Sequence, residues 1–295
     1  MTQLLLVIGK KKNNIIRTQF TYYKNGSSFD YKAASLYSVA IHEDGDLLSL
    51  GYINSKTGDI YGVEQFQLDH KKPLNRWNTL FSDNEVKLKL TNGSKNTYYS
   101  TTSKFTIVPS LFFDPSKTKE ILSGVVSIDK GESVFSNFIP EIDSHIIFSI
   151  REDLKSLFQS KIGHTKFSHH WASLISTYHL YYVSEDIKSV FVQYHQNKFS
   201  LCLYAGKKLI QFNTFDFKTP EDIIYYIYYT MEQFGFTPKE SVIHLGGNYA
   251  DHNAVTTTLQ RYTEKIFHLK PNCCNTLSTE KSDAIINTIF DLQCG

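Results

Sequence analysis

The chain carries the same three-strand pattern twice, and this repeat limits how it can fold more than any other feature. Alternating apolar residues predict strands at 37–43, 47–53 and 60–68 in the first half. The same pattern returns at 190–195, 199–204 and 209–217. The connectors are rich in Asp, Asn and Gly, which tolerate the backbone geometry of tight turns. Each triplet is therefore predicted to form an antiparallel meander.

Three helices and two further strands are predicted after the second meander. Thr219 and Asp222 have the spacing of a capping box, Pro220 suits the first turn, and Gly235 is the stop signal. Beyond this helix the pattern predicts a strand at 241–245, a helix at 253–262, a strand at 266–269 and a last helix at about 279–290. Strands that alternate with helices favour parallel pairing.

The helix that begins at Pro220 has two apolar faces. One face carries Ile223, Ile227, Met231 and Phe234, and it is expected to point into the core. The other is aromatic and carries Tyr225, Tyr226 and Tyr229. Such a second face suits either a partner surface or packing against the other half of the chain.

The first half follows the same plan more loosely. We expect a short helix at 74–81, a strand at 105–108, a helix at 115–122, a strand at 146–150 and a helix at 151–162 that stops at Gly163. Both halves then have the order β-β-β-α-β-α-β. The expected domains are an N-terminal extension at 1–36, a first lobe at 37–183 and a second lobe at 184–295.

Composition excludes several classes of function. The chain is 41% hydrophobic and 20% charged with a formal charge of +2, so it should fold and shows no broad basic surface for nucleic acid. The three lysines at 10–12 suit a solvated turn or a small basic patch. The apolar run at 4–8 is too short for a signal peptide, and no segment reaches membrane-spanning length. A cytoplasmic protein with reduced cysteines is expected, with Cys202 buried in a strand.

A meander followed by alternating helices and strands, given twice, resembles the layout of the actin, sugar-kinase and heat-shock ATPase superfamily. Residues 209–215 and 221–226, together with 105–109 and 166–169, resemble an uncharacterised domain-of-unknown-function family of Bacteroidetes-type bacteria with an actin-like ATPase fold. The resemblance covers about 37–269. It implies an α/β protein of duplicated ribonuclease-H-like halves, each a mixed sheet flanked by helices, around a nucleotide cleft.

The resemblance also implies where nucleotide chemistry would lie. Active members of the superfamily place an Asp-x-Gly element in the first hairpin of each lobe, where it orders magnesium and cradles phosphates. The first hairpin here has Asp44 and Gly45, which also suit the tip of a tight turn. The second hairpin has Gln196 and Asn197, with neither a carboxylate nor a glycine.

A glycine pair follows the strand at 241–245 and resembles the adenosine-contacting motif of the superfamily. Gly246 and Gly247 would let the backbone approach a base and ribose, but they equally suit a turn from strand into helix. The histidines at 164, 169, 170 and 179 have no Cys or carboxylate at a familiar ligand spacing, so no metal is expected. Cys273 and Cys274 with His268 make no site either.

These observations favour a catalytically silent actin-like protein that acts as a cytoplasmic binding or scaffold protein for protein partners and needs no cofactor. No catalytic residue and no metal ligand is expected. The alternative is a divergent ATP-binding protein or phosphotransferase that uses an interlobe cleft with Asp44, Gly45, Gly246 and Gly247. Phosphoryl transfer depends on positioned charge, so a dismantled second hairpin argues against hydrolysis.

Overall fold

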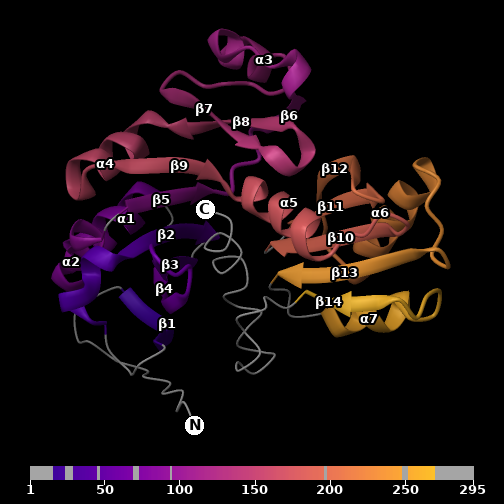
Figure 1. Ribbon diagram of the computed structural model, residues 1–295, viewed down its shortest axis with the longest axis horizontal. Helices are drawn as coiled ribbons and strands as arrows, with labels where there is room; N and C mark the ends of the chain where they lie inside the picture. The colour runs from indigo at the N-terminus through magenta and orange to yellow at the C-terminus, as the bar shows by residue number, and fades with distance from the viewer. Residues whose placement is uncertain are drawn as a thin grey trace. The chain divides into compact units, whose positions relative to one another are not determined.

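The computed structural model describes residues 16–23, 29–44, 47–68, 73–93, 95–195, 198–247 and 252–269. These residues form two compact units, and the division falls between Ser176 and Thr177. The division lies inside helix α5 (His170–Tyr181), which the sequence pattern did not predict. Each unit is built on one large sheet (Figure 1).

The sheet of the second unit has five strands in the order β12-β11-β10-β13-β14. The strands β10, β11 and β12 form the predicted antiparallel meander, and β13 and β14 continue the sheet in parallel. Their bounds are Lys188–His195 for β10, Lys198–Ala205 for β11, Lys208–Asp216 for β12, Ser241–Gly247 for β13 and Ile266–His268 for β14. The strands expected in this half are thereby confirmed.

Two helices of the second unit share a core with its sheet. Helix α6 (Pro220–Gln233) begins with the predicted capping box, in which Thr219 and Asp222 exchange side-chain to backbone hydrogen bonds. Helix α7 spans His252–Leu259. Ile223, Ile227 and Met231 of α6 are buried with Val190 and Leu201 of the strands. Burial of such aliphatic side chains is the main stabilising contribution to this unit.

The main sheet of the first unit has the order β1-β4-β3-β2-β5-β9. Five of its strands, from β4 to β9, repeat the second sheet in order and in direction, with an antiparallel meander extended by two parallel strands. The predicted duplication is therefore confirmed. The bounds are Ile16–Tyr23 for β1, Tyr37–Asp44 for β2, Leu47–Asn54 for β3, Ile60–Leu68 for β4, Lys95–Ser100 for β5 and Thr165–His169 for β9.

Part of the expected first extension contributes to the sheet. Strand β1 lies at its edge and pairs antiparallel with β4, and a 3₁₀ turn at Tyr31–Leu36 precedes β2. The sequence pattern gave no strand signal before residue 37.

The prediction for the central part of the first half was wrong in one respect. The strands expected at 105–108 and 146–150 do form, as β6 (Phe105–Pro109) and β8 (Ser144–Arg151), but they belong to a separate sheet of order β6-β8-β7 with β7 at Glu132–Ile139. The strands that complete the repeated plan are β5 and β9. Both were missed because polar residues dominate them, including buried Asn96 and Ser168.

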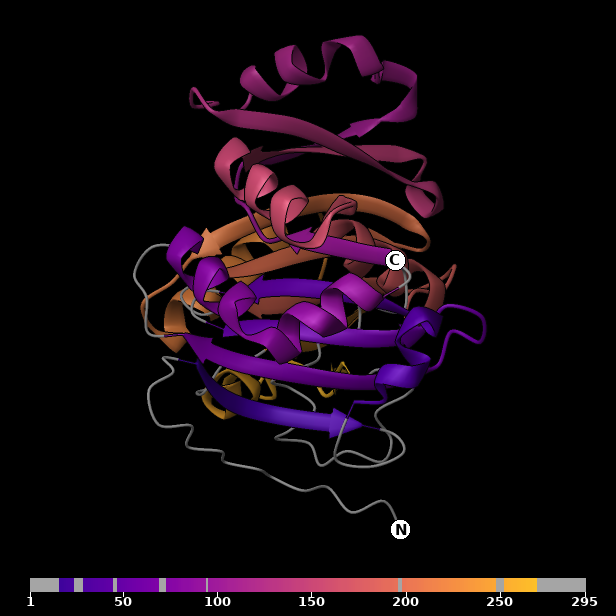
Figure 2. The ribbon, with the colours of Figure 1, turned by 90° about the vertical axis from the view of Figure 1, so that its left-hand side faces the viewer.

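The helices of the first unit are mostly short. They are α1 (Pro73–Ser82), α2 (Asn84–Asn92), α3 (Thr118–Ser123, after a 3₁₀ turn at Pro115–Lys117) and α4 (Glu152–Ile162). Residues of α1, α2 and α4 share one core with the main sheet and with Phe148 and Ile150 of β8. Leu122 of α3 is buried, and Figure 2 shows α3 on the outer side of the small sheet.

Three further expectations can be compared with the structure. Phe234 was expected on the buried face of α6, but it is 41% exposed because the helix ends at Gln233 and Phe234 caps it. Cys202 is a buried free thiol as expected, and burial raises its pKa well above the ordinary value. The last predicted helix, at 279–290, lies outside the described residues. Within the described part of the chain, no helix is long and apolar enough to cross a bilayer.

Candidate functional site

The first-lobe hairpin is formed by β2 and β3. Asp44 is the last residue of β2 and stands opposite Leu47 of β3, while Gly45 lies outside the described residues. The residue before Asp44 has an unusual environment, because Glu43 is a carboxylate that is only 9% exposed. The neighbours of Glu43 determine whether its carboxylate can bind a ligand at this end of β2.

Three donors hold the buried carboxylate of Glu43. Arg76 donates from Nη2 to Oε1 at 2.7 Å, and Trp77 donates from its indole N–H to Oε2 at 2.9 Å. The hydroxyl of Tyr98 donates to Oε2 at 3.2 Å, and burial together with this carboxylate raises the pKa of Tyr98 well above its ordinary value. With these partners Glu43 stabilises the junction of β2, α1 and β5, so it is committed to structure rather than to a metal ion.

The second-lobe hairpin is tight. His195 of β10 pairs directly with Lys198 of β11, so only Gln196 and Asn197 connect the strands. Those two residues lie outside the described part of the chain, but their identity settles one point. Neither can supply the carboxylate that orders magnesium in active superfamily members, and neither is a glycine.

The glycine pair lies at the end of β13, and the packing of the chain itself accounts for both residues. Gly247 has φ of +86°, and a Cβ there would lie 2.2 Å from the backbone oxygen of Tyr194. A Cβ on Gly246 would lie 2.6 Å from the side-chain oxygen of Gln193 and 2.7 Å from Leu269. Contact of this pair with adenosine stays a prediction.

The histidines singled out in the sequence do not converge on a metal. The Nε2–H of His169 donates to the carbonyl oxygen of Thr102 at 3.0 Å, and its Nδ1 accepts from the backbone N–H of Trp171. Both ring nitrogens are therefore used within the fold, which assigns the proton to Nε2. Among the described residues no group of three or more His, Cys, Asp or Glu side chains could hold a metal ion. Cys273 and Cys274 lie outside them.

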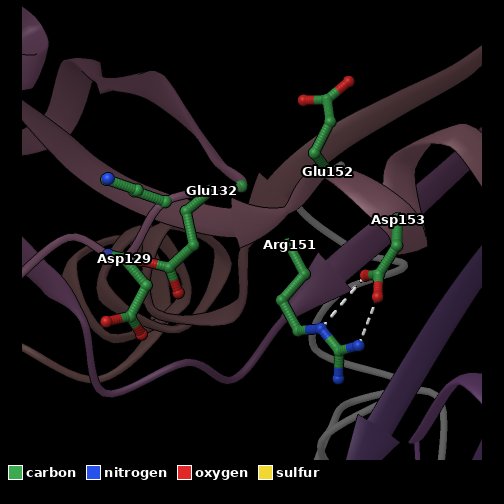
Figure 3. Close-up of a pocket in the computed structure, with 7 residues that line it drawn as sticks. Asp129, Glu132, Arg151, Glu152 and Asp153 are labelled. Atoms are coloured by element: carbon green, nitrogen blue, oxygen red, sulfur yellow. Dashed lines mark hydrogen bonds and ion pairs between the residues drawn. The ribbon is translucent and has the colours of Figure 1, made fainter.

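One hollow of about 410 Å³ lies beside the small sheet, at the start of β7 and of α4, and it was not predicted (Figure 3). Lys104 binds Asp129 at 2.7 Å and Glu132 at 3.0 Å, and these hydrogen bonds raise the pKa of Lys104. Arg151 forms an ion pair with Asp153. The lining residues are Asp129, Lys130, Gly131, Glu132, Arg151, Glu152 and Asp153.

The carboxylates of this hollow are already neutralised by neighbours. Glu152 accepts from Ser133 and forms an ion pair with Lys155, and these contacts lower its pKa. With cations beside the acidic side chains, the hollow has the chemistry of an ion-paired surface rather than of a general acid and base. No sequence signal marks it, because Lys104 meets residues more than twenty positions away.

His244 of β13 should make the second unit sensitive to acid. Its ring stacks on Phe191 at 4.6 Å between ring centres, and burial lowers its pKa to about 4. The unfolded chain, with an ordinary value near 6.5, therefore binds more protons between pH 6.5 and 4. Stability is then full above pH 6.5 and is lost as the pH falls toward 4.

We expect the free energy of unfolding of the second unit to drop by about 2 kcal/mol between pH 8 and pH 5 from this group alone. Urea unfolding at the two pH values measures the drop. The variant His244→Phe keeps a stacking ring and removes the titrating group, so its drop should be smaller by that amount. An equal drop in both proteins would show that His244 is not the cause.

Comparison with solved structures identifies the fold as that of the actin-like ATPases. The chain is similar to a protein of Bacteroides thetaiotaomicron with an actin-like ATPase fold and unknown function, with a TM-score of 0.79 at 16% identity, over 91% of this chain and 100% of that one. It is also similar to a chain of the PilM-PilN type IV pilus biogenesis complex, with a TM-score of 0.60 at 9% identity, over 88% and 97%. The expected actin-like architecture is confirmed.

The family follows from the sequence itself. The chain belongs to the family described as a protein of unknown function, DUF3822, whose sequence model matches residues 26–266. No curated protein is similar enough in sequence to match the chain. The predicted membership of an uncharacterised family with this fold is therefore confirmed.

The identity of the second hairpin bears on the magnesium nucleotide that the fold family implies. It has Gln196 and Asn197 where the resemblance implies an Asp-x-Gly element, and in the first hairpin the Glu43 carboxylate next to Asp44 is bound by Arg76. Because phosphoryl transfer depends on positioned charge, the absence of ATP hydrolysis stays a prediction from these residues.

Proposed function

We propose that this chain is a cytoplasmic bacterial protein that works by binding other proteins, as a scaffold or assembly partner, and that it does not hydrolyse ATP. Nucleic acid is not among its proposed partners. The observation that carries the proposal is the second-lobe hairpin, where the β10 to β11 turn holds Gln196 and Asn197 in place of a magnesium-ordering carboxylate and a glycine.

Two further observations support a binding role. The close approach of the Tyr194 backbone already requires glycine at 247, and the side chains of Gln193 and Leu269 pack closely on Gly246, so the pair needs no ligand to explain it. The similarly folded PilM is known from its complex with PilN, which makes a protein partner the natural occupant for a chain of this fold without an intact clamp. Pseudo-ATPase is then the appropriate class.

Nucleotide hydrolysis and nucleotide binding test the proposal separately. Purified chain with ATP and magnesium should release no phosphate above a buffer blank, and its melting temperature should stay unchanged. A bound ligand at a hundred times its Kd would add about 2.7 kcal/mol to the free energy of unfolding, which is an easily measured rise in melting temperature.

The control variant is Asp44→Asn, which keeps the size of the side chain and its tolerance of turns. Magnesium-dependent phosphate release that this variant abolishes would overturn the proposal and establish the divergent phosphotransferase instead. A rise in melting temperature with ATP but no turnover would establish an ATP-binding protein. The identity of the second hairpin would then no longer argue against a nucleotide site.

A further inference from the structure

The small sheet of the first unit exposes more large apolar side chains than its size requires. Leu111 is 86% exposed, Phe112 70%, Val125 62% and Phe138 52%. Exposed apolar residues scattered singly need no explanation, whereas a contiguous group marks an interaction site. The question is therefore whether these side chains adjoin one another.

Ring contacts around His145 link Phe138 to the segment that carries Leu111 and Phe112. The ring of Phe113 stacks on His145 at 3.6 Å between ring centres, and Phe138 lies 4.9 Å from the same ring. Phe138 also pairs with His145 across β7 and β8. Leu111 and Phe112 immediately precede Phe113. We call this surface the apolar platform, and it comprises Leu111, Phe112, Phe113, Phe138 and His145.

The backbone holds the platform in place. The N–H of Ser110 donates to the carbonyl oxygen of Asp143 at 2.9 Å, and the N–H of Phe113 donates to that of Ser110 at 3.2 Å. Leu111 and Phe112 therefore project from a 3₁₀ turn that is tied to the start of β8. A surface fixed in this way loses little conformational entropy when a partner covers it.

The charge around the platform indicates what covers it. Apart from Asp129 and Glu132, which Lys104 binds, and Lys130 between them, residues 109–145 carry four acidic side chains and two lysines, whereas the whole chain is slightly basic. Asp114 and Asp143 adjoin the platform in sequence, and hydrogen bonds from Ser116 lower the pKa of Asp114, so it stays ionised. Lys117 is the cation beside them, and it offsets only part of this negative charge.

This negative charge distinguishes three possible occupants of the platform: a second copy of the chain, a membrane surface and a different protein. A second copy of the chain would bring the same acidic residues face to face, and like charges at an interface cost affinity. An anionic membrane surface would be repelled for the same reason. A protein segment that combines apolar anchors with Lys or Arg has complementary charge and buries the exposed Leu and Phe side chains.

We propose that the apolar platform is the docking surface for a protein partner that presents aliphatic or aromatic anchors next to basic side chains. The proposal rests on the proposed binding function and assigns it a surface. Leu111 and Phe112 supply the apolar contact area, Phe113 and His145 form its floor, and Asp114 and Asp143 attract the basic residues.

A random dodecapeptide library displayed on phage, selected on the immobilised full-length chain, tests this surface. The enriched peptides should carry at least two apolar anchors and an excess of Lys and Arg. In titrations with the synthetic peptides, the double variant Leu111→Asp with Phe112→Asp should raise Kd by about tenfold or more. The double variant Asp114→Asn with Asp143→Asn should raise Kd by about threefold and weaken its dependence on salt. Asn keeps both the cap of Asp114 and the left-handed backbone of Asp143.

Leu88→Asp is the matched control, because Leu88 is 48% exposed on α2 and receives the same new charge. It should leave Kd within about twofold. Circular dichroism of each variant shows that it is folded. Enrichment of acidic peptides, no enrichment, or equal binding to the Leu111 and Phe112 variant would each overturn the proposal.

Two further arms separate the rejected occupants. Self-association in the ultracentrifuge that the Leu111 and Phe112 variant abolishes would assign the platform to a second copy. Binding to phosphatidylserine vesicles that the same variant abolishes would assign it to a membrane surface. These failures concern only the platform, whereas magnesium-dependent ATP hydrolysis would count against the proposed function and leave the peptide result standing.

Discussion

Replacing Gly247 with alanine is expected to lower the free energy of unfolding of the second unit by about 4 kcal/mol. The new Cβ would lie 2.2 Å from the backbone oxygen of Tyr194 and 2.8 Å from its backbone nitrogen. Backbone atoms in the centre of a sheet cannot move aside as the end of a flexible side chain can. The strand pair β10 and β13 would have to separate, and the positive φ adds its own strain.

Urea unfolding followed by circular dichroism measures this loss, and the chain offers a matched control. Gly235 has φ of +69° in the same unit, but a Cβ there meets nothing within 4 Å. Gly235→Ala should therefore cost only about 1 kcal/mol, the strain of the left-handed backbone alone. Equal costs for the two variants would show that the close approach to Tyr194 is not what requires glycine.

This steric role affects how nucleotide binding can be tested. Loss of an ATP effect in a Gly246 or Gly247 variant would not identify a nucleotide contact, because either substitution also disturbs the packing of β13. Asp44→Asn avoids the difficulty, since Asn has nearly the same volume as Asp and equally tolerates a turn. A substitution at Asp44 therefore tests nucleotide binding more directly than a substitution at Gly246 or Gly247.

The strands and α6 in the described part of the second unit could be predicted from sequence, because their local signals agree with the tertiary structure. Turn residues separate every strand of the meander, and the Thr219 capping box begins α6 where the structure has it. Apolar residues alternate in β10 and β11. When propensity, capping and periodicity all favour the same element, the local preferences of the chain agree with its tertiary packing.

The first unit could be predicted only in part, because several of its buried elements are polar. Strand β5 places Asn96 and Ser100 in the interior, where Asn96 bonds the carbonyl oxygen of Leu90. Helix α5, within which the two units divide, contains His170 and Thr177, both fully or almost fully buried. Neither segment has a one-sided apolar pattern, so period-based reasoning finds no face.

The positions of the two hairpins and of the glycine pair could be predicted from the sequence. The side-chain contacts around them could not. The partners of Glu43 lie 33, 34 and 55 positions away along the chain. No spacing rule relates such residues before the fold is known. The apolar platform was missed for the opposite reason, because a sequence shows apolar residues without showing whether the fold exposes them.

Replacing Glu43 with alanine is expected to destabilise the first unit by about 4 kcal/mol. The side chain of Arg76 is only 9% exposed, so its charge would stay buried after the Glu43 carboxylate is removed. The indole N–H of Trp77, fully buried, would lose its acceptor as well. Leaving a buried charge and a buried donor without Glu43 costs more than the ion pair itself contributes.

Thermal and urea unfolding of four variants tests this account: Glu43→Ala, Arg76→Met, the double variant of the two, and a control on an exposed pair. Glu240→Ala removes the same side chain from the exposed pair with Lys188 at 3.3 Å, and it should cost less than about 1 kcal/mol. The double variant Glu43→Ala with Arg76→Met should recover part of the loss, because it also removes the buried charge that has lost its ion pair with Glu43. If the double variant loses the full sum of both single effects, Glu43 and Arg76 act independently, and the ion pair is not the reason that Glu43 stabilises the first unit.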